Sequence, residues 1–276
     1  MPEPRSADLR FRPVENRAPR TLSAAQLERW NRDGFVTPLT LFDRDEAVDV
    51  RARCDALLEQ REDGAYAINC FQARSRTLWE LCTEPRLLDA VEDLIGPDIV
   101  CWASHFFCKL PGDPKRVPWH QDAIYWHLAP ARTVTVWLAI DDVDEENAAM
   151  RFLPGSHALG ALAWEPAEDD AVLGKAIDDV SALGEPLSND LPAGAFSLHA
   201  DMLAHGSAPN RSDRRRCGLT IRYCPPEVRA TDERWRRGLE PILCRGRDPS
   251  GHWRHHDRPP GDDIRGVRPP HDLGGN

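Results

Sequence analysis

The residues best suited to chemistry lie in the stretch Trp119-His120-Gln121-Asp122, which holds an imidazole and a carboxylate two positions apart. If residues 117–126 form a β-strand, side chains two apart share a face, so His120 and Asp122 point at one spot. His205, 85 residues further along, is our candidate for a third ligand from another part of the fold. Two histidines and one carboxylate on one side of a metal ion form the ligand set of non-haem Fe(II) oxygenases. The spacing therefore predicts a metal site whose opposite side is open to small molecules.

Two other His-x-Asp triplets compete with the pair at 120 and 122. With 10 His and 28 Asp among 276 residues, about one such triplet is expected by chance, and the chain has three. His199-Ala200-Asp201 leaves His205 on the same segment, where a straight strand carries it about 13 to 20 Å away. His255-His256-Asp257 lies in a Pro-, Arg- and Gly-rich tail that is typical of disorder. Only the first pair has both a strand-like setting and a distant partner.

Composition excludes several classes of partner. The net charge of -10 and the pI of about 5.5 argue against nucleic acid, which is bound by surplus Lys and Arg. No run of about 18 apolar residues occurs, so we expect no membrane-spanning segment. The eight cysteines form no C-x-x-C pair and follow no apolar signal segment, which favours reduced thiols and a cytoplasmic location. Nothing in the sequence indicates an oligomeric state.

The elements that must position these residues change type near residue 99. Capping and helix-ending residues predict helices from 24 to about 33, from 44 to about 61 and from 85 to about 95. Apolar and β-branched runs predict strands near 99–110, 117–126, 133–140, 150–153, 195–203 and 217–224. Strands that follow one another without helical spacing favour a double-sheet barrel. We therefore predict a mainly β protein: a double-stranded β-helix, or jelly-roll, barrel with flanking N-terminal helices.

The chain is best divided into one domain with two polar ends. Residues 1–20 have few apolar positions and predict a flexible arm, and residues 21–246 hold the single barrel domain. After about Arg245 the chain is rich in Arg, Pro, Gly and His, so residues 247–276 are expected to be a disordered tail. The acidic stretch from about 158 to 190 has weak periodicity and is interpreted as a surface excursion or lid.

An Fe(II) ion held by three protein ligands needs a source of two electrons to use O2. The usual co-substrate is 2-oxoglutarate, which binds the metal through its 1-carboxylate and keto oxygen. Its 5-carboxylate needs a cation, and the planar guanidinium of Arg suits a carboxylate better than Lys does. Arg216 begins the predicted strand after His205, and alternation places it on the polar face. Arg214 or Arg215 would take its place if a bulge shifts the register.

A longer series of residues matches one known family in order and spacing, over roughly residues 100 to 225. The matching residues are Trp119-His120-Gln121-Asp122, Trp137, Phe152-Leu153-Pro154-Gly155-Ser156-His157, His205-Gly206-Ser207, Asn210-Arg211-Ser212 and Arg216. With these residues the chain resembles the phytanoyl-CoA dioxygenase family of Fe(II)/2-oxoglutarate-dependent oxygenases. One departure is Asn147-Ala148-Ala149, since the family often has Gly before its Pro-Gly-Ser-His segment.

The resemblance implies roles for particular residues. His120, Asp122 and His205 would bind Fe(II). Arg216 would hold the 5-carboxylate of 2-oxoglutarate, and Ser207 and Trp137 would line the co-substrate pocket. Family members that halogenate resemble this pattern with a small residue in place of Asp122, so the carboxylate favours hydroxylation. A further group is interpreted from the sequence alone: His105, His127 and His199 as structural residues, Lys109 and Arg222 as polar contacts near the barrel mouth, and Trp102, Phe107, Tyr125 and Trp126 as either pocket or core.

The resemblance implies an enzyme that uses Fe(II), 2-oxoglutarate and O2 to hydroxylate an unactivated C–H bond. Its substrate would be a small metabolite or natural-product intermediate. The acidic surface disfavours polyanions such as CoA thioesters unless Arg-rich segments near 229–247 offset it, which favours a neutral or cationic molecule. One alternative is a cupin-like metal-dependent enzyme that needs no 2-oxoglutarate and gives Arg216 no role. The other is a binding protein that keeps the barrel without catalysis.

Overall fold

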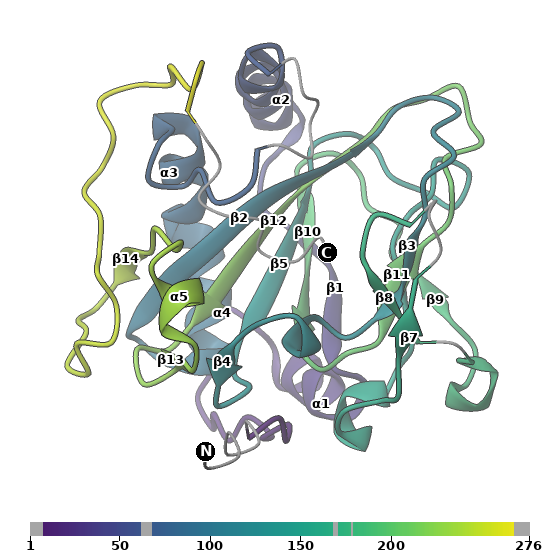
Figure 1. Ribbon diagram of the computed structural model, residues 1–276, viewed down its shortest axis with the longest axis horizontal. Coiled ribbons are helices and arrows are strands. Elements are labelled where there is room, and N and C mark those ends of the chain that lie inside the picture. Colours follow the sequence, from purple (N-terminus) through teal and green to yellow (C-terminus); the bar gives the residue numbers. More distant parts are fainter. Residues whose placement is uncertain (1–7, 62–67, 168–170, 178, 268–276) are drawn as a thin grey trace.

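The structure is a computed structural model that describes residues 8–61, 68–167, 171–177 and 179–267. Parts of the predicted arm and tail, 1–7 and 268–276, lie outside the described residues. The larger sheet contains, in order, β1 (Phe35–Thr40), β10 (Ala195–Ala200), β5 (Val134–Ala139), β12 (Arg216–Cys224), β2 (Ile99–Lys109) and β14 (Ile242–Arg245). The smaller sheet contains β3 (Val117–His120), β11 (His205–Ser207), β6 (Arg151–Phe152) and β9 (Leu187–Ser188). All these neighbours are antiparallel, and the predicted mainly β jelly-roll architecture is confirmed (Figure 1).

The remaining elements are short strands and helices. Two-residue strands pair as β4 (Leu128–Ala129) with β13 (Arg229–Ala230) and as β7 (Glu165–Pro166) with β8 (Lys175–Ala176). The helices are α1 (Ala24–Asp33), α2 (Arg44–Leu58), α3 (Arg76–Cys82), α4 (Pro85–Ile95) and α5 (Glu233–Arg236). Both predicted capping boxes are present, at Ser23 for α1 and at Asp43 for α2. The bounds predicted for α1 and α4 are confirmed, and α2 ends three residues before its predicted limit.

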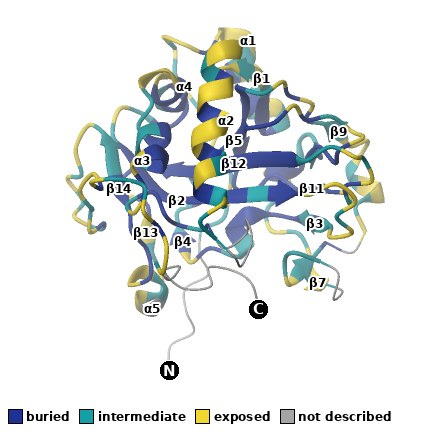
Figure 2. Cartoon of the chain, turned by 90° about the horizontal axis from the view of Figure 1, so that it is seen from above, coloured by how far each residue is buried: buried dark blue, intermediate teal, exposed yellow. Residues whose placement is uncertain are grey.

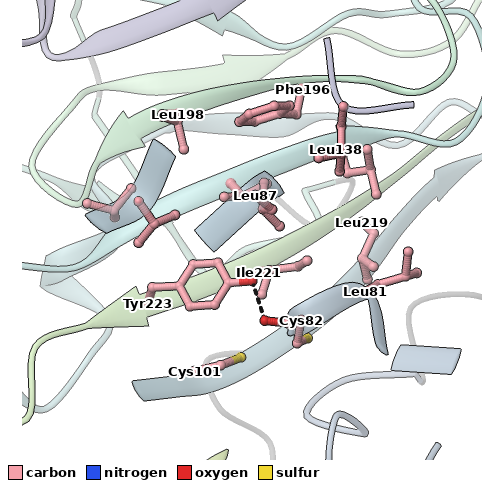
Figure 3. Close-up of a cluster of buried hydrophobic side chains, with 14 of the residues drawn as sticks. Leu81, Cys82, Leu87, Cys101, Leu138, Phe196, Leu198, Leu219, Ile221 and Tyr223 are labelled. Carbon is pink, nitrogen blue, oxygen red and sulfur yellow. Dashed lines mark hydrogen bonds between the residues drawn. The ribbon is translucent and has the colours of Figure 1, made fainter. Parts of the chain in front are cut away.

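Helices α1 to α4 pack against one face of the larger sheet and form the main apolar core with it. Figure 2 shows the strands buried beneath α2, whose outward side is exposed. On β12 this core face carries Cys217, Leu219, Ile221 and Tyr223. The Tyr223 hydroxyl donates a hydrogen bond of 2.8 Å to the Cys82 carbonyl of α3 (Figure 3). Alternation therefore turns Arg216, Thr220 and Arg222 to the opposite face, toward the smaller sheet, as the sequence predicts.

Several short elements were not predicted, and for three of them the reason can be named. β1 contains Pro38, which counts against a strand in a sequence. It is tolerated because β1 is at the edge of its sheet and the pairing register shifts between Val36 and Leu39. Helices α3 and α5, with seven and four residues, are too short to show a 3.6-residue period.

The described part of the predicted arm, residues 8–20, contains no helix or strand but has defined contacts. The Asn31 side chain of α1 exchanges two hydrogen bonds with the backbone of Val14, at 2.8 and 3.0 Å. The Asp93 carboxylate of α4 accepts backbone hydrogen bonds from Thr21 and Leu22, both at 2.8 Å. The segment thus crosses the ends of two helices, where the sequence predicted a loose arm.

Residues 246–267 differ from the predicted tail without fixed structure. They form no helix or strand, but Ile264 is completely buried in the main core. The Asp262 carboxylate accepts hydrogen bonds from the Ser75 hydroxyl at 2.6 Å and from the Thr77 backbone and hydroxyl at 2.8 and 2.9 Å. Isolated anchors in an irregular segment leave no periodic pattern, so composition alone misjudged these residues.

The acidic stretch 158–190 is partly built into the barrel rather than only a surface excursion. Its end forms β9, the edge strand that pairs with β6, and Ile177 is buried. Residues 168–170 and 178 lie outside the described part of the chain.

Neither a membrane helix nor a disulfide contributes to this architecture. No helix in the described ranges is long and apolar enough to cross a bilayer. All eight cysteines are free, and seven of them are buried.

Replacing Asp262 with Ala should destabilise the protein because three donors at the start of α3 lose their acceptor. We expect a loss of about 1–3 kcal/mol in the free energy of unfolding, measured by urea denaturation. The matched control is Asp263→Ala, because Asp263 is exposed and its ion pair is with the neighbouring exposed Arg265. Equal urea midpoints of unfolding for the two variants would show that Asp262 does not anchor residues 246–267.

Candidate metal centre

Three buried side chains from separate parts of the chain meet between the sheets. β11 lies antiparallel to β3 with His205 opposite His120, and the two imidazole centroids are 4.1 Å apart. Asp122 follows β3, and its Oδ1 is 3.5 Å from Nε2 of His120. One ligand atom from each of the three residues lies within 4.8 Å of the others, so a single ion could contact all three. The structure therefore brings the three predicted ligands together.

Asp122 reaches this place by a different route from the predicted one. β3 ends at His120, and Asp122 begins a three-residue 3₁₀ helix, so the predicted strand over 117–126 is wrong beyond residue 120. The buried Gln121 side chain fixes the change of direction by donating to the carbonyls of Gly160 and Met202, at 2.9 and 2.7 Å. Strand alternation thus predicted the correct neighbours for an incorrect reason.

Both histidines are held in the tautomer that a metal ligand requires. Nδ1 of His120 lies 2.8 Å from the Pro118 carbonyl, and Nδ1 of His205 lies 2.9 Å from the Leu203 carbonyl. A carbonyl oxygen only accepts hydrogen bonds, so each Nδ1 must donate and carries the hydrogen. Each neutral ring is left with its lone pair on Nε2, the arrangement that backbone carbonyls impose on metal-binding histidines.

The protonation states also suit a metal. Burial by itself would raise the pKa of Asp122, but the contacts with His120 and His199 outweigh burial and hold this pKa well below its usual value. Burial lowers the pKa of His205 well below its usual value. Metal ions bind the ionised carboxylate and the neutral imidazole. The donor set therefore fits a divalent ion that accepts nitrogen and oxygen ligands.

Arg216 is buried in the same cavity, at 2% exposure. Its Nε donates to the Ala148 carbonyl at 3.2 Å, and its two Nη atoms donate to the Phe107 carbonyl at 3.3 Å and to the Ser207 hydroxyl at 3.1 Å. These contacts fix the plane of the guanidinium on the inner face of β12. The side chain thus points where the sequence predicted.

The two alternatives to Arg216 are directed elsewhere. Arg214 forms an ion pair with Asp144 at 2.8 Å. Arg215 pairs with Asp141 at 2.8 Å and with Asp55 of α2 at 2.7 Å. Neither lines the cavity, so no bulge has shifted the register at this end of β12.

Lys109 is a second buried basic residue beside Arg216. The two residues are opposite each other in β2 and β12, and Nζ of Lys109 donates to the Ser207 hydroxyl at 2.8 Å and to the Ala208 carbonyl. Burial and the charge of Arg216 lower the pKa of Lys109 to about 6. Because the Ser207 oxygen accepts from both cations, its own hydrogen remains available to a ligand. The group suits a carboxylate, whose charge would favour the ammonium form of Lys109.

Trp137 forms the wall of the cavity next to Arg216. The centroid of its ring is 5.7 Å from the guanidinium carbon of Arg216. The indole lies directly over Gly218, where any Cβ would overlap it. Glycine on β12 therefore makes the space that this side chain occupies.

The segment that departs from the resembled pattern forms a strained turn. Ala148 has a φ of +69°, the left-handed region that glycine adopts without strain. For alanine this conformation costs roughly 1–2 kcal/mol. The Ala148 carbonyl is the one that accepts from Nε of Arg216, so the strained turn positions the guanidinium.

A further histidine beside the site was interpreted from sequence as structural. His199 is almost completely buried, its Nε2 is 3.8 Å from Oδ2 of Asp122, and neither ring nitrogen has a hydrogen-bond partner among the described residues. Asp201, the other half of that rival triplet, lines a different cleft and accepts from the Thr133 backbone at 2.9 Å. The pairing of β10 with both β1 and β5 places His199 here, and no sequence spacing indicates it.

These side chains line one cavity between the two sheets. Its wall is completed by Phe107, Val117, Thr135, Met150, Thr220 and Arg222. Of the four aromatic residues singled out in the sequence, Phe107 lines the cavity, whereas Trp102, Tyr125 and Trp126 belong to a separate apolar cluster.

Comparison with known proteins gives consistent matches. L-proline trans-4-hydroxylase of Streptomyces griseoviridis is 26% identical over 230 residues, which cover 71% of this chain and 84% of that protein. A probable phytanoyl-CoA dioxygenase of Caenorhabditis elegans is 29% identical over 60% of this chain, which spans 57% of that protein's length. The apo structure of the non-heme monooxygenase ThoJ is similar with a TM-score of 0.73 and 30% identity, over 85% of this chain and 88% of that one.

The family model described as phytanoyl-CoA dioxygenase matches residues 30–218, more than half of the chain. This range contains all three candidate metal ligands and Arg216. The chain therefore belongs to the phytanoyl-CoA dioxygenase family of Fe(II)/2-oxoglutarate-dependent oxygenases.

Proposed function

We propose that this protein is a 2-oxoglutarate-dependent hydroxylase of a small metabolite or natural-product intermediate. His120, Asp122 and His205 hold Fe(II), and Arg216 holds the 5-carboxylate of 2-oxoglutarate. The observation that carries the proposal is the pair of Nε2 lone pairs beside the Asp122 carboxylate, in one cavity with a buried guanidinium. Three ligands on one side of the ion leave its other positions to the co-substrate and O2.

The protein side chains bind and orient the co-substrate. The Arg216 guanidinium offers a planar fork of donors, and the Ser207 hydroxyl adds a third donor next to it. Trp137 limits the width of this end of the cavity, so the keto acid end of the molecule is directed toward the metal ligands. Apolar side chains at Val117 and Met150 reduce the space for water beside the reacting groups.

When bound, Fe(II), 2-oxoglutarate and O2 supply an oxidation that converts a substrate C–H bond into C–OH, while 2-oxoglutarate becomes succinate and CO2. Asp122 favours this outcome over halogenation, because its carboxylate fills the position that a halide would need. The relative that acts as an L-proline trans-4-hydroxylase supports a small substrate and a hydroxylation.

Changing His120, Asp122 or His205 to Ala should remove stoichiometric Fe(II) binding, because two ligands cannot retain the ion. Anaerobic titration with Fe(II) and 2-oxoglutarate should then lack the visible charge-transfer band that we expect for the wild type. His255→Ala is the control, since His255 pairs with Asp248 at 3.0 Å, away from the cavity. A wild-type band in any of the three variants would refute that ligand assignment.

Arg216→Ala should weaken 2-oxoglutarate binding on the order of 10- to 100-fold, the effect of losing charge-assisted hydrogen bonds. Succinate formation at increasing 2-oxoglutarate concentrations measures the change. Arg214→Ala, which removes partly exposed ion pairs with Asp144 and Glu146, should leave the 2-oxoglutarate requirement unaltered. Turnover that needs no 2-oxoglutarate would instead favour the cupin-like alternative, and bound iron without oxygen uptake would favour the binding protein.

Gly218→Ala should disturb the co-substrate end of the cavity, because its Cβ overlaps the Trp137 ring. Overpacking should lower the free energy of unfolding by about 1–3 kcal/mol. The variant should also bind 2-oxoglutarate more weakly than the wild type does. Gly261→Ala is the matched control, since a Cβ there meets no atom within 4 Å. If co-substrate affinity equals that of the wild type, Trp137 does not shape the pocket.

A further inference from the structure

Arg222 is another buried cation on the inner face of β12, six residues beyond Arg216. Its exposure is 8%, and it lines the same cavity as the candidate metal ligands. The guanidinium carbon is 5.1 Å from the ring centroid of Trp126 and 5.7 Å from that of Trp102. The two indoles therefore hold the side chain in place while its polar atoms border the cavity.

No protein anion pairs with this guanidinium. Across the described ranges of the chain, Arg222 forms no hydrogen bond or ion pair, and its Nε is buried without an acceptor. Contacts with aromatic faces offset only part of the unfavourable burial of a charge. Asp122 and Arg222 both line the cavity, but these two side chains form no ion pair. The guanidinium thus lacks a carboxylate partner among the residues that the structure describes.

The register of the larger sheet places Arg222 near the metal position and away from Arg216. Arg222 is opposite Thr135, whose Oγ1 is 3.4 Å from Oδ2 of Asp122. Six residues of strand separate the backbones of Arg222 and Arg216 by roughly 20 Å. The two side chains therefore enter the cavity from different ends of β12, which suits them to different anionic groups.

We propose that Arg222 binds a carboxylate of the organic substrate, so that the substrate is a small carboxylic acid, such as an amino acid. This inference rests on the proposed function, because it requires a second ligand beside 2-oxoglutarate. The planar guanidinium fork matches a carboxylate. The negative charge of Asp122 nearby favours a monoanion over a dianion such as a phosphate ester.

The 1-carboxylate of 2-oxoglutarate is another carboxylate that Arg222 could bind. An experiment can distinguish it from a carboxylate of the substrate. Wild-type protein and the Arg222→Gln, Arg222→Lys and Arg44→Gln variants are loaded anaerobically with Fe(II) and 2-oxoglutarate. Arg44 is exposed and serves as the control. Probes are the proteinogenic amino acids and short aliphatic and aromatic acids, each compared with its primary amide. Shifts of the visible charge-transfer band report probe binding, and calorimetry with Ni(II)-loaded protein reports the 2-oxoglutarate affinity.

We expect some acids, and not their amides, to shift the wild-type band. Arg222→Gln should weaken binding of those acids on the order of 30- to 100-fold while leaving the affinity for 2-oxoglutarate unchanged. Arg222→Lys keeps a positive charge and should therefore retain part of the affinity for the acids. Weaker 2-oxoglutarate binding in Arg222→Gln would assign Arg222 to the 1-carboxylate and overturn the proposal. Equal binding of acids and amides by the wild type would overturn it without any variant. Failure of the wild type to form the band would instead overturn the proposed oxygenase function.

Discussion

The pairing of β3 with β11 is the constraint on which the candidate site depends, because it sets His205 directly opposite His120. Gly206 allows the strands to approach, since a Cβ there would lie 2.9 Å from the Val117 carbonyl oxygen. The same two segments supply the carbonyls that fix both tautomers. The backbone of these two segments therefore sets both the separation of the two histidines and the position of the hydrogen on each ring. A metal ion would meet a preformed set of donors, which lowers the entropy lost on binding.

β12 connects this arrangement to the rest of the protein through its two unlike faces. One face packs four side chains into the helix-covered core, and the other carries Arg216 and Arg222 into the cavity. Burying cations, like the left-handed turn at Ala148, opposes stability, and such features concentrate at functional sites. The apolar face offsets this loss, since strongly buried neighbours hold the strand in register. The functional face is thus made possible by the packing behind it.

The sequence predicted the residues of the candidate site better than their surroundings. The alternation of β12 was predicted correctly because both faces obey a period of two, and its pairing with β2 runs without a shift from Arg216 to Arg222. Alternation failed for Asp122, because the turn after His120 depends on hydrogen bonds from Gln121 to carbonyls 39 and 81 residues away. His199 and the contacts of Asp262 were missed for the same reason. Each depends on a long-range neighbour that no local pattern encodes.

The charge of the surface and the charge of the cavity favour different ligands. The net charge of -10 suggested a neutral or cationic substrate, but that reasoning considered only the exterior. Inside, Arg216 and Arg222 present cationic groups in a medium that screens them less than water does. A zwitterion satisfies both conditions, because it is neutral at long range and offers a carboxylate at short range. Polyanions meet repulsion before they can reach the buried cations, so the two charge patterns together select for small size and a single negative group.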